Sequence, residues 1–200
     1  AKGLNPWVVL DQAPAWATVP PNPEAFARYA AAVADRYAES VRYYQVWHNP
    51  NLGDSWGGAA DPFAYADMLA RTAAAIRAVD ADARIVLGSL APTAETGNRN
   101  YAEDIYLTML YDLGAADSFD VVAAQPYGFT TGPDDRRVSR EVLNTSRVIL
   151  LRETMVAHGD AQKAIWAADF GWNSKPSAWP GPASVWGEVD ETTQAAYTVA

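Results

Sequence analysis

The sequence has no cysteine, only two histidines, and fewer basic than acidic residues. Without cysteine the chain has no disulfide and no thiolate metal site, which fits either a reducing or an oxidising compartment. A formal net charge of −9 argues against a nucleic-acid partner or an anionic membrane surface. No apolar run is long enough to span a bilayer, and no signal-peptide pattern opens the chain. We therefore expect no membrane contact through this segment.

Sequence motifs for cofactors and metals are also missing. No Gly-x-Gly-x-x-Gly follows the first predicted strand, and there is no P-loop. Asn49, Asn51 and Asp54 lack the spacing and the closing glutamate of a calcium-binding EF-hand loop. We predict neither a cofactor nor a metal site.

Apolar and aromatic residues are abundant. Half of the residues are hydrophobic and 20% are charged, which predicts a packed globular core. Three of the eight tryptophans, Trp16, Trp56 and Trp172, lie in loops shortly after predicted strands. An indole ring at a strand end offers a flat apolar face that can stack on a sugar ring, and packing in the core is the alternative role.

Predicted strands and amphipathic helices alternate five times along the chain. Asn22-Pro23 and Asp61-Pro62 each join an N-cap residue to a proline at the first helical position. Strand–helix alternation indicates parallel strands with right-handed crossovers, and units of roughly 35–45 residues are typical of a barrel with long loops. The strands are expected at 7–10, 41–47, 84–88, 119–124 and 164–168, and the helices at 23–37, 61–79, 101–113, 141–158 and from 191.

The predicted fold class is therefore α/β, a (β/α) TIM barrel. Five units are fewer than the eight strands that close such a barrel in about 250 residues. We expect one domain over residues 1–200, a partial barrel truncated at both ends.

The segment 41–58 contains the first functional motif. Trp47-His48-Asn49-Pro50-Asn51 ends a predicted strand and resembles the strand-four motif Trp-Asn-Glu-Pro-Asn of retaining glycoside hydrolases, the β-xylosidases of family 39 type and their bacterial relatives. The resemblance aligns the five units with barrel strands three to seven. In that family the glutamate is the general acid/base, and Asn49 stands at its position here.

A second motif, Trp166-Ala167-Ala168-Asp169-Phe170-Gly171-Trp172, resembles the strand-seven pattern Trp-x-x-Glu-Phe-Gly-Trp. The resemblance places Asp169 at the position of the catalytic nucleophile. It also implies that Tyr127, in Gln125-Pro126-Tyr127, stands where the family often has a tyrosine that hydrogen-bonds the nucleophile. The expected substrate-binding residues are His48, Trp16, Trp47, Asn51, Trp56, Tyr127 and Trp172.

Both catalytic positions depart from the family pattern. Retaining hydrolysis needs two carboxylates about 5–5.5 Å apart. The amide of Asn49 cannot supply a proton, and a lost general acid lowers the rate roughly 100- to 10,000-fold. Asp169 is one methylene shorter than glutamate, which withdraws its carboxylate by ~1.5 Å, and a displacement of about 1 Å can lower the rate on the order of 100-fold.

Three substitutes for the missing acid are open. Histidine is a side chain that can supply a proton, but strand alternation points His48 away from the direction of Asn49 and favours a structural hydrogen-bonding role. Asp54 in the following loop is a second source of a proton. In the third scheme Asp169 acts as a base on water.

The sequence thus supports two interpretations. The first is a glycoside-hydrolase-like protein acting on O-glycosidic bonds of a poly- or oligosaccharide through a modified active site. The alternative is a catalytically inactive, carbohydrate-binding pseudo-hydrolase domain of a larger cell-surface protein. Either role makes carbohydrate the expected partner and an extracellular or cell-surface location the expectation, while the sugar, its linkage and the oligomeric state stay open.

Overall fold

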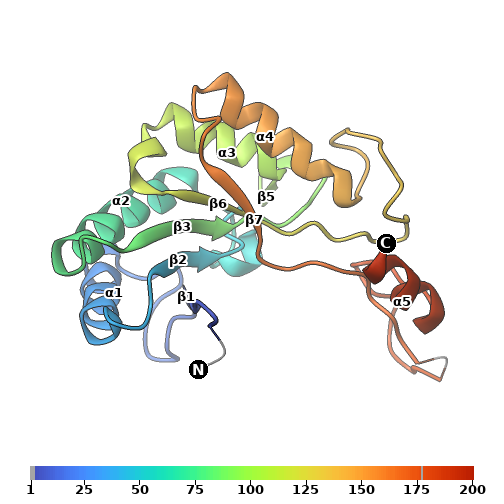
Figure 1. The fold of residues 1–200 in the computed structure, drawn as a ribbon, viewed down its shortest axis with the longest axis horizontal. Coiled ribbons are helices and arrows are strands. Elements are labelled where there is room, and N and C mark those ends of the chain that lie inside the picture. Colours follow the sequence, from blue (N-terminus) through green and yellow to red (C-terminus); the bar gives the residue numbers. More distant parts are fainter. Residues whose placement is uncertain (1–2, 177) are drawn as a thin grey trace.

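The computed structural model describes residues 3–176 and 178–200. Strands and helices alternate along most of the chain, and one small hairpin interrupts the pattern (Figure 1). Short 3-10 turns lie at Gly53–Ser55, Ala115–Ser118 and Thr145–Arg147. The elements are β1 (Trp7–Leu10), α1 (Pro23–Tyr37), β2 (Tyr43–His48), α2 (Pro62–Val79), β3 (Arg84–Ser89), β4 (Thr96–Gly97), β5 (Asn100–Tyr101), α3 (Glu103–Asp112), β6 (Val121–Ala124), α4 (Val148–Ala157), β7 (Ala164–Ala167) and α5 (Glu191–Val199).

The central sheet has five parallel strands in the order β1-β2-β3-β6-β7, so each strand pairs with the next strand of this sheet along the chain, and the β4-β5 hairpin lies apart from it. This order is that of a barrel, because a doubly wound sheet reverses its direction partway. The sheet is curled: the rings of Trp7 on β1 and Trp166 on β7 lie 5.5 Å apart across its concave face. The predicted partial (β/α) barrel is confirmed.

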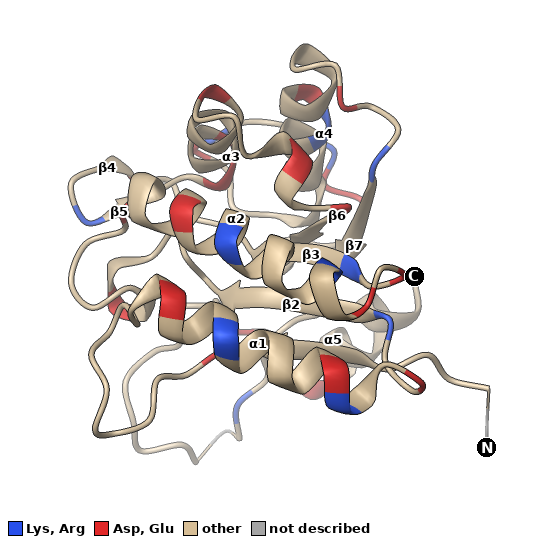
Figure 2. Cartoon of the chain, turned by 90° about the vertical axis from the view of Figure 1, so that its left-hand side faces the viewer, with Lys and Arg blue, Asp and Glu red and all other residues tan. Residues whose placement is uncertain are grey.

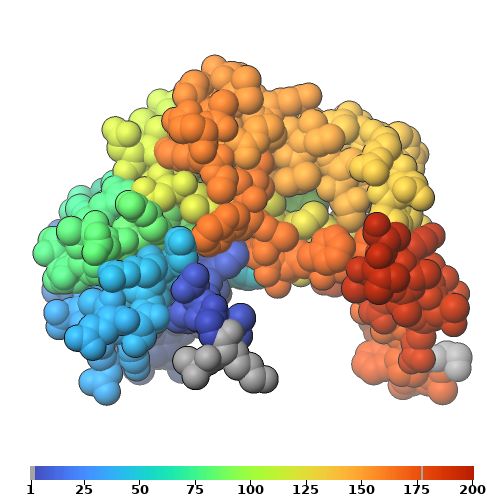
Figure 3. Space-filling model, in the orientation of Figure 1, coloured from blue at the N-terminus to red at the C-terminus, as the bar shows by residue number. Residues whose placement is uncertain are grey.

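Apolar side chains cover both faces of the sheet. On the convex face, residues such as Leu10, Val46 and Leu87 form the main core together with buried residues of the helices. On the concave face, Val86, Val121 and Ala123 form a smaller cluster with the rings of Trp7, Tyr43 and Trp166. The open side of the curled sheet appears in the space-filling view as a hollow between the N-terminal part and the segment with α5 (Figure 3).

The outer surface of α1 and α2 carries charges of both signs (Figure 2). Arg71 on α2 lies 2.8 Å from Asp67 and 3.7 Å from Glu24 on α1. Exposed pairs of this kind contribute about 0–1 kcal/mol each to stability. This face is a solvated surface, and the polar side chains that converge lie instead at the carboxyl ends of the strands.

Helix starts follow the predicted capping chemistry. The side chain of Asn22 accepts a hydrogen bond from the Ala25 N–H, and Asp61 accepts from the N–H groups of Phe63 and Ala64. Both helices begin with the proline that follows the cap. Such side chains satisfy backbone donors that have no partner within the helix.

The predicted start of the fourth helix was wrong. Residues 141–144 are irregular, and α4 begins at Val148. The cause is Arg147, which is 2% exposed and forms two bonds of 2.7 Å with the carboxylate of Glu103. Its guanidinium also donates to the carbonyls of Ser139 (3.1 Å) and Thr93 (2.9 Å). Backbone that turns its carbonyls toward a buried cation cannot at the same time form a helix.

A tyrosine hydroxyl separates β2 from β3 near their carboxyl ends. The buried Tyr65 of α2 donates to the Val46 carbonyl (2.9 Å) and accepts from the Gly88 N–H (2.7 Å). The ladder pairs Val46 with Leu87 and His48 with Ser89, but it skips the pair between them. A Cβ at Gly88 would lie 2.7 Å from the Val46 carbonyl oxygen, so only glycine fits at this position.

Removing this hydroxyl should destabilise the fold. Tyr65→Phe keeps the ring but leaves a buried carbonyl and a buried N–H without a partner, which predicts a loss of about 2–4 kcal/mol in the free energy of unfolding. The matched control is Tyr29→Phe on α1, where the side chain is 52% exposed and the expected change is within about 0.5 kcal/mol. Urea unfolding measures both variants. Equal stability of the two would show that the hydroxyl bridge is dispensable.

Candidate functional site

The carboxyl ends of the strands bring polar side chains together from five segments. His48 ends β2, Ser89 ends β3, Gln125 follows β6, Asp169 comes shortly after β7, and Asp11 follows β1 directly. Parallel strands present these ends at one edge of the sheet, which is where (β/α) barrels carry their functional groups. The convergence makes this edge the candidate site.

Gln125 connects three of these groups through its amide nitrogen. Its Nε2 donates to the Oδ1 of Asn49 at 2.7 Å and to the Oγ of Ser89 at 3.1 Å, and it lies 3.4 Å from the Nε2 of His48. Gln125 is 4% exposed, so this amide is held in place by its surroundings. The side chain at the predicted acid/base position is therefore engaged as a hydrogen-bond acceptor.

The expectation that His48 points away from Asn49 was wrong, because both side chains reach Gln125. Strand alternation fails at Trp47 (φ 71°), and Asn49 (φ 51°) is also in the left-handed region. The Trp47 ring turns to the convex side, where it lies 5.8 Å from the ring of Phe26. As a result, the side chain of His48 lies on the concave side of the sheet.

A cavity of about 290 Å³ lies at this edge of the sheet. His48 and Asp169 line it from β2 and from the segment after β7, so the predicted nucleophile position and the histidine face the same space. Trp7, Val9, Gln45 and Ala168 complete the lining. Because β1 and the segment that follows β7 both contribute, the curl of the sheet is what creates the cavity.

A second, aromatic cavity of about 220 Å³ lies beside Asp169. The rings of Tyr127 and Trp186 are 5.1 Å apart in its wall, and Trp172 and Phe170 contribute to it. Burial is the main cause that raises the pKa of Tyr127, and the negative charge of Asp169 adds to it. The resemblance implies a hydrogen bond between Tyr127 and Asp169; among the described residues only this charge effect links the two, with no hydrogen bond between them. Trp186 was missed, because it lies in a Pro- and Gly-rich loop with no strand before it.

Three of the predicted sugar-binding residues lie in the interior. Trp47 and Trp56 are 2% and 3% exposed and contact each other edge to face. Asn51 is fully buried and bonds the backbone of Ala91 and Tyr101. These side chains offer no face to a ligand, so the predicted binding role does not fit them and we assign them to packing.

The other two predicted tryptophans differ in exposure. Trp16 is 88% exposed in the loop after β1. Trp172 is 5% exposed, and its Nε1 donates to the Thr131 carbonyl at 2.6 Å, so only part of its ring reaches the aromatic cavity. Asp54, the loop residue considered as an acid, pairs with Arg99.

Asp11 is the carboxylate that the sequence analysis missed. It is half-buried directly after β1, and burial raises its pKa, while the Gln12 N–H and a protonated His48 act in the opposite direction. A carboxyl group with a raised pKa near a cavity is a candidate proton donor. The signal was the position itself, since Asp11 follows Trp7-Val8-Val9-Leu10 as Asp169 follows the last strand.

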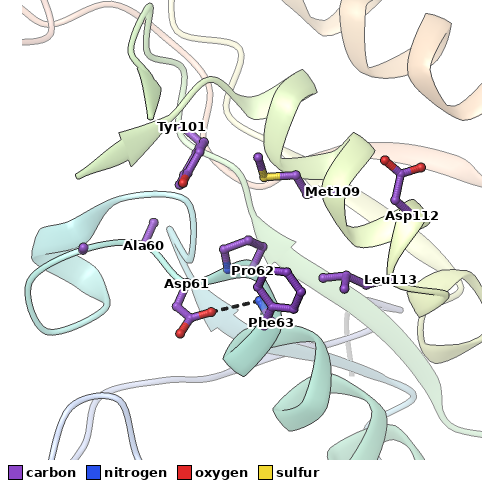
Figure 4. A pocket seen from close by; sticks show the side chains of 9 residues that line it. Ala60, Asp61, Pro62, Phe63, Tyr101, Met109, Asp112 and Leu113 are labelled. Atoms are coloured by element: carbon purple, nitrogen blue, oxygen red, sulfur yellow. Dashed lines mark hydrogen bonds between the residues drawn. The ribbon is translucent and has the colours of Figure 1, made fainter. Parts of the chain in front are cut away.

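A larger groove of about 550 Å³ lies on the outside of the barrel, between the start of α2 and α3 (Figure 4). Its wall is mostly apolar, with Pro62, Phe63 and Leu113 among the lining residues. The carboxylate of Asp61 bonds the Phe63 N–H as a helix cap, as the dashed line in Figure 4 shows. This groove lacks converging polar groups and is separate from the candidate site.

Neither a protein-family model nor a curated protein matches the sequence. Solved structures do match. A glucosidase from Croceicoccus marinus superposes with a TM-score of 0.66 at 16% identity over 90% of this chain and 37% of its own length. A family 39 glycoside hydrolase from Bacteroides cellulosilyticus superposes with a TM-score of 0.60 at 17% identity, over 88% of this chain and 33% of its own length. A monomeric β-xylosidase from Caulobacter crescentus superposes with a TM-score of 0.55 at 24% identity, over 78% of this chain and 32% of its own length.

The chain has the fold of part of the (β/α) barrel that these structures contain. It spans about a third of the length of these structures. At these identities the likeness establishes the fold of the partial barrel and not its activity. The resemblance read from the two strand-end motifs is confirmed at that level. Within the described residues no helix is long and apolar enough to cross a bilayer.

Asp11 gives the partial barrel a predicted pH dependence. The pKa of Asp11 in the folded state lies above its ordinary value of 3.8. The protonated carboxyl of Asp11 therefore stabilises the folded state below pH 3.8, and this stabilisation is lost as the pH rises through the raised pKa. Asp11→Asn removes the charged form. Its free energy of unfolding relative to the native chain should therefore increase between about pH 3 and pH 7, as measured by urea unfolding. A difference that stays constant or falls would contradict the burial of this carboxyl.

Proposed function

We propose that residues 1–200 form one domain, part of a glycoside-hydrolase-like barrel, that binds a poly- or oligosaccharide at the strand ends without hydrolysing it. The observation that carries the proposal is the hydrogen bond from Gln125 to the Oδ1 of Asn49. It occupies the side chain at the position where the family resemblance places the general acid/base. An amide cannot protonate a leaving group.

The cavities support a carbohydrate ligand. His48 and Asp169 offer polar contacts in the first cavity, and the neighbouring aromatic cavity offers the rings of Tyr127 and Trp186. Polar groups that fix orientation beside apolar ring faces suit a sugar, whose ring carries hydroxyls at its edge and C–H groups on its faces. From the proposed polysaccharide ligand we also propose an extracellular or cell-surface location.

One observation favours hydrolysis as a second candidate function. Asp11 and Asp169 are carboxylates that follow the two edge strands of the sheet, β1 and β7, and burial raises the pKa of Asp11. Glycoside hydrolysis needs an acid with a raised pKa opposite a second carboxylate. In this scheme Asp11 replaces the missing acid and Asp169 acts as nucleophile or base.

Binding and turnover are measured on the same panel of xylose- and glucose-based oligosaccharides and aryl glycosides. We expect calorimetric binding by the native chain with no release of aglycone above background. Asp169→Asn or Trp186→Ala should weaken binding about tenfold, the loss expected for one charged hydrogen bond or one stacked ring. Asp112→Asn, in the outer groove, is the matched control and should bind like the native chain.

The outcomes separate the two candidates. If the native chain turns over a substrate, and each of the single variants Asp11→Asn and Asp169→Asn abolishes this turnover, hydrolysis is established and the binding-only proposal is overturned. Turnover that appears only in the double variant Asn49→Glu, Asp169→Glu would show that the native site is a degenerate hydrolase. A folded native chain that neither binds nor cleaves any of these sugars would overturn both candidates.

A further inference from the structure

We propose that Ser89 is a positioning residue that holds His48 in the tautomer with its proton on Nε2, so that His48 presents a hydrogen-bond donor to the cavity. The ligand group that it recognises is then an oxygen acceptor, such as a sugar hydroxyl. The choice of a sugar rests on the proposed function, whereas the tautomer is argued from the hydrogen bonds around Ser89.

The first step is the orientation of Gln45. Its Nε2 lies 2.8 Å from the carbonyl oxygen of Trp47, which can only accept, so this atom is the amide nitrogen and donates. The same Nε2 lies 3.2 Å from the Oγ of Ser89 and directs its second N–H there. Gln45 is fully buried, so its orientation is fixed by these contacts.

The second step concerns the hydroxyl of Ser89, which is also fully buried. It accepts from Gln45 and, at 3.1 Å, from the Nε2 of Gln125. The Gln125 amide has two N–H groups. With one directed to Ser89 and the other to the Oδ1 of Asn49 at 2.7 Å, none is left for the Nε2 of His48, which lies farther away at 3.4 Å. A hydroxyl has two acceptor lone pairs and one donor. With both lone pairs engaged, its proton goes to the remaining neighbour, the Nδ1 of His48 at 2.9 Å.

The third step is the consequence for His48. A ring nitrogen that accepts a hydrogen bond carries no proton, so the neutral imidazole carries its proton on Nε2. A neutral imidazole N–H donates hydrogen bonds but is a poor acid at neutral pH. This tautomer therefore suits ligand binding and not the delivery of a proton to a leaving group.

The cavity suits a ligand group that both donates and accepts hydrogen bonds. His48 would donate from its Nε2, whereas the carboxylate of Asp169, which lines the same space, accepts. A sugar hydroxyl can both donate and accept, so it can bond either group.

The chain offers an internal control for the tautomer. It has only two histidines, and the Nδ1 of His158 lies 2.8 Å from the Thr154 carbonyl oxygen. Since a carbonyl only accepts, His158 carries its proton on Nδ1. The two rings are therefore expected in opposite tautomers when neutral.

Long-range nitrogen–proton NMR spectra of the native chain labelled with ¹⁵N-histidine at alkaline pH distinguish the two tautomers directly. We expect the Nε2–H pattern for His48 and the Nδ1–H pattern for His158, assigned with His158→Gln. Ser89→Ala should convert the His48 signals to those of a mixed tautomer and leave His158 unchanged. The Nδ1–H pattern for His48 in the native chain would overturn the inference, and this result needs no folded variant.

The role in recognition is tested separately by adding an oligosaccharide that binds in the calorimetric assay. We expect the His48 Nε2 signal to shift on binding while the Nε2–H pattern persists. A bound sugar that leaves this signal unshifted would overturn the donor role. Because the spectrum of the free chain requires no ligand, failure of the tautomer and failure of carbohydrate binding are distinguishable.

Discussion

The position of one hydroxyl group determines the geometry of the strand ends. Tyr65 reaches from α2 into the sheet and bonds Val46 and Gly88, which interrupts the ladder between β2 and β3. Beyond this point alternation no longer holds, so Trp47 packs on the convex side while His48 and Ser89 meet on the concave side. An irregularity that redirects side chains next to a functional site is a recurrent feature of sheets. The contact of His48 with Ser89 depends on this bridge.

The network around Gln125 is suited to binding. Its amide holds Asn49 and Ser89 at fixed distances, and Ser89 in turn contacts His48. Side chains that hydrogen bonds hold in one orientation lose little entropy when a ligand is bound. The carboxylates at the edge, Asp11 and Asp169, lie outside this network, because no hydrogen bond joins either of them to it within the described residues.

Local sequence patterns predicted most of the fold. Asn22-Pro23 and Asp61-Pro62 set the helix starts because caps act within a few residues. The partial barrel followed from strand–helix alternation. The errors came from contacts distant in sequence: Arg147 reaches Glu103, 44 residues away, and prevents the expected helix from starting earlier. The burial of Trp56 against Tyr65 and Trp47 also depends on tertiary packing, which no spacing of aromatic residues reveals.

The most direct test of the account is a crystal structure of the chain with a bound oligosaccharide. We expect an intact glycosidic bond, a sugar hydroxyl within hydrogen-bonding distance of the His48 Nε2, and the Oδ1 of Asn49 still bonded to Gln125. A cleaved sugar with the Asp11 carboxyl at the glycosidic oxygen would contradict the account and establish a hydrolase. A sugar bound only in the outer groove beside Phe63 would show that the strand ends are not the site.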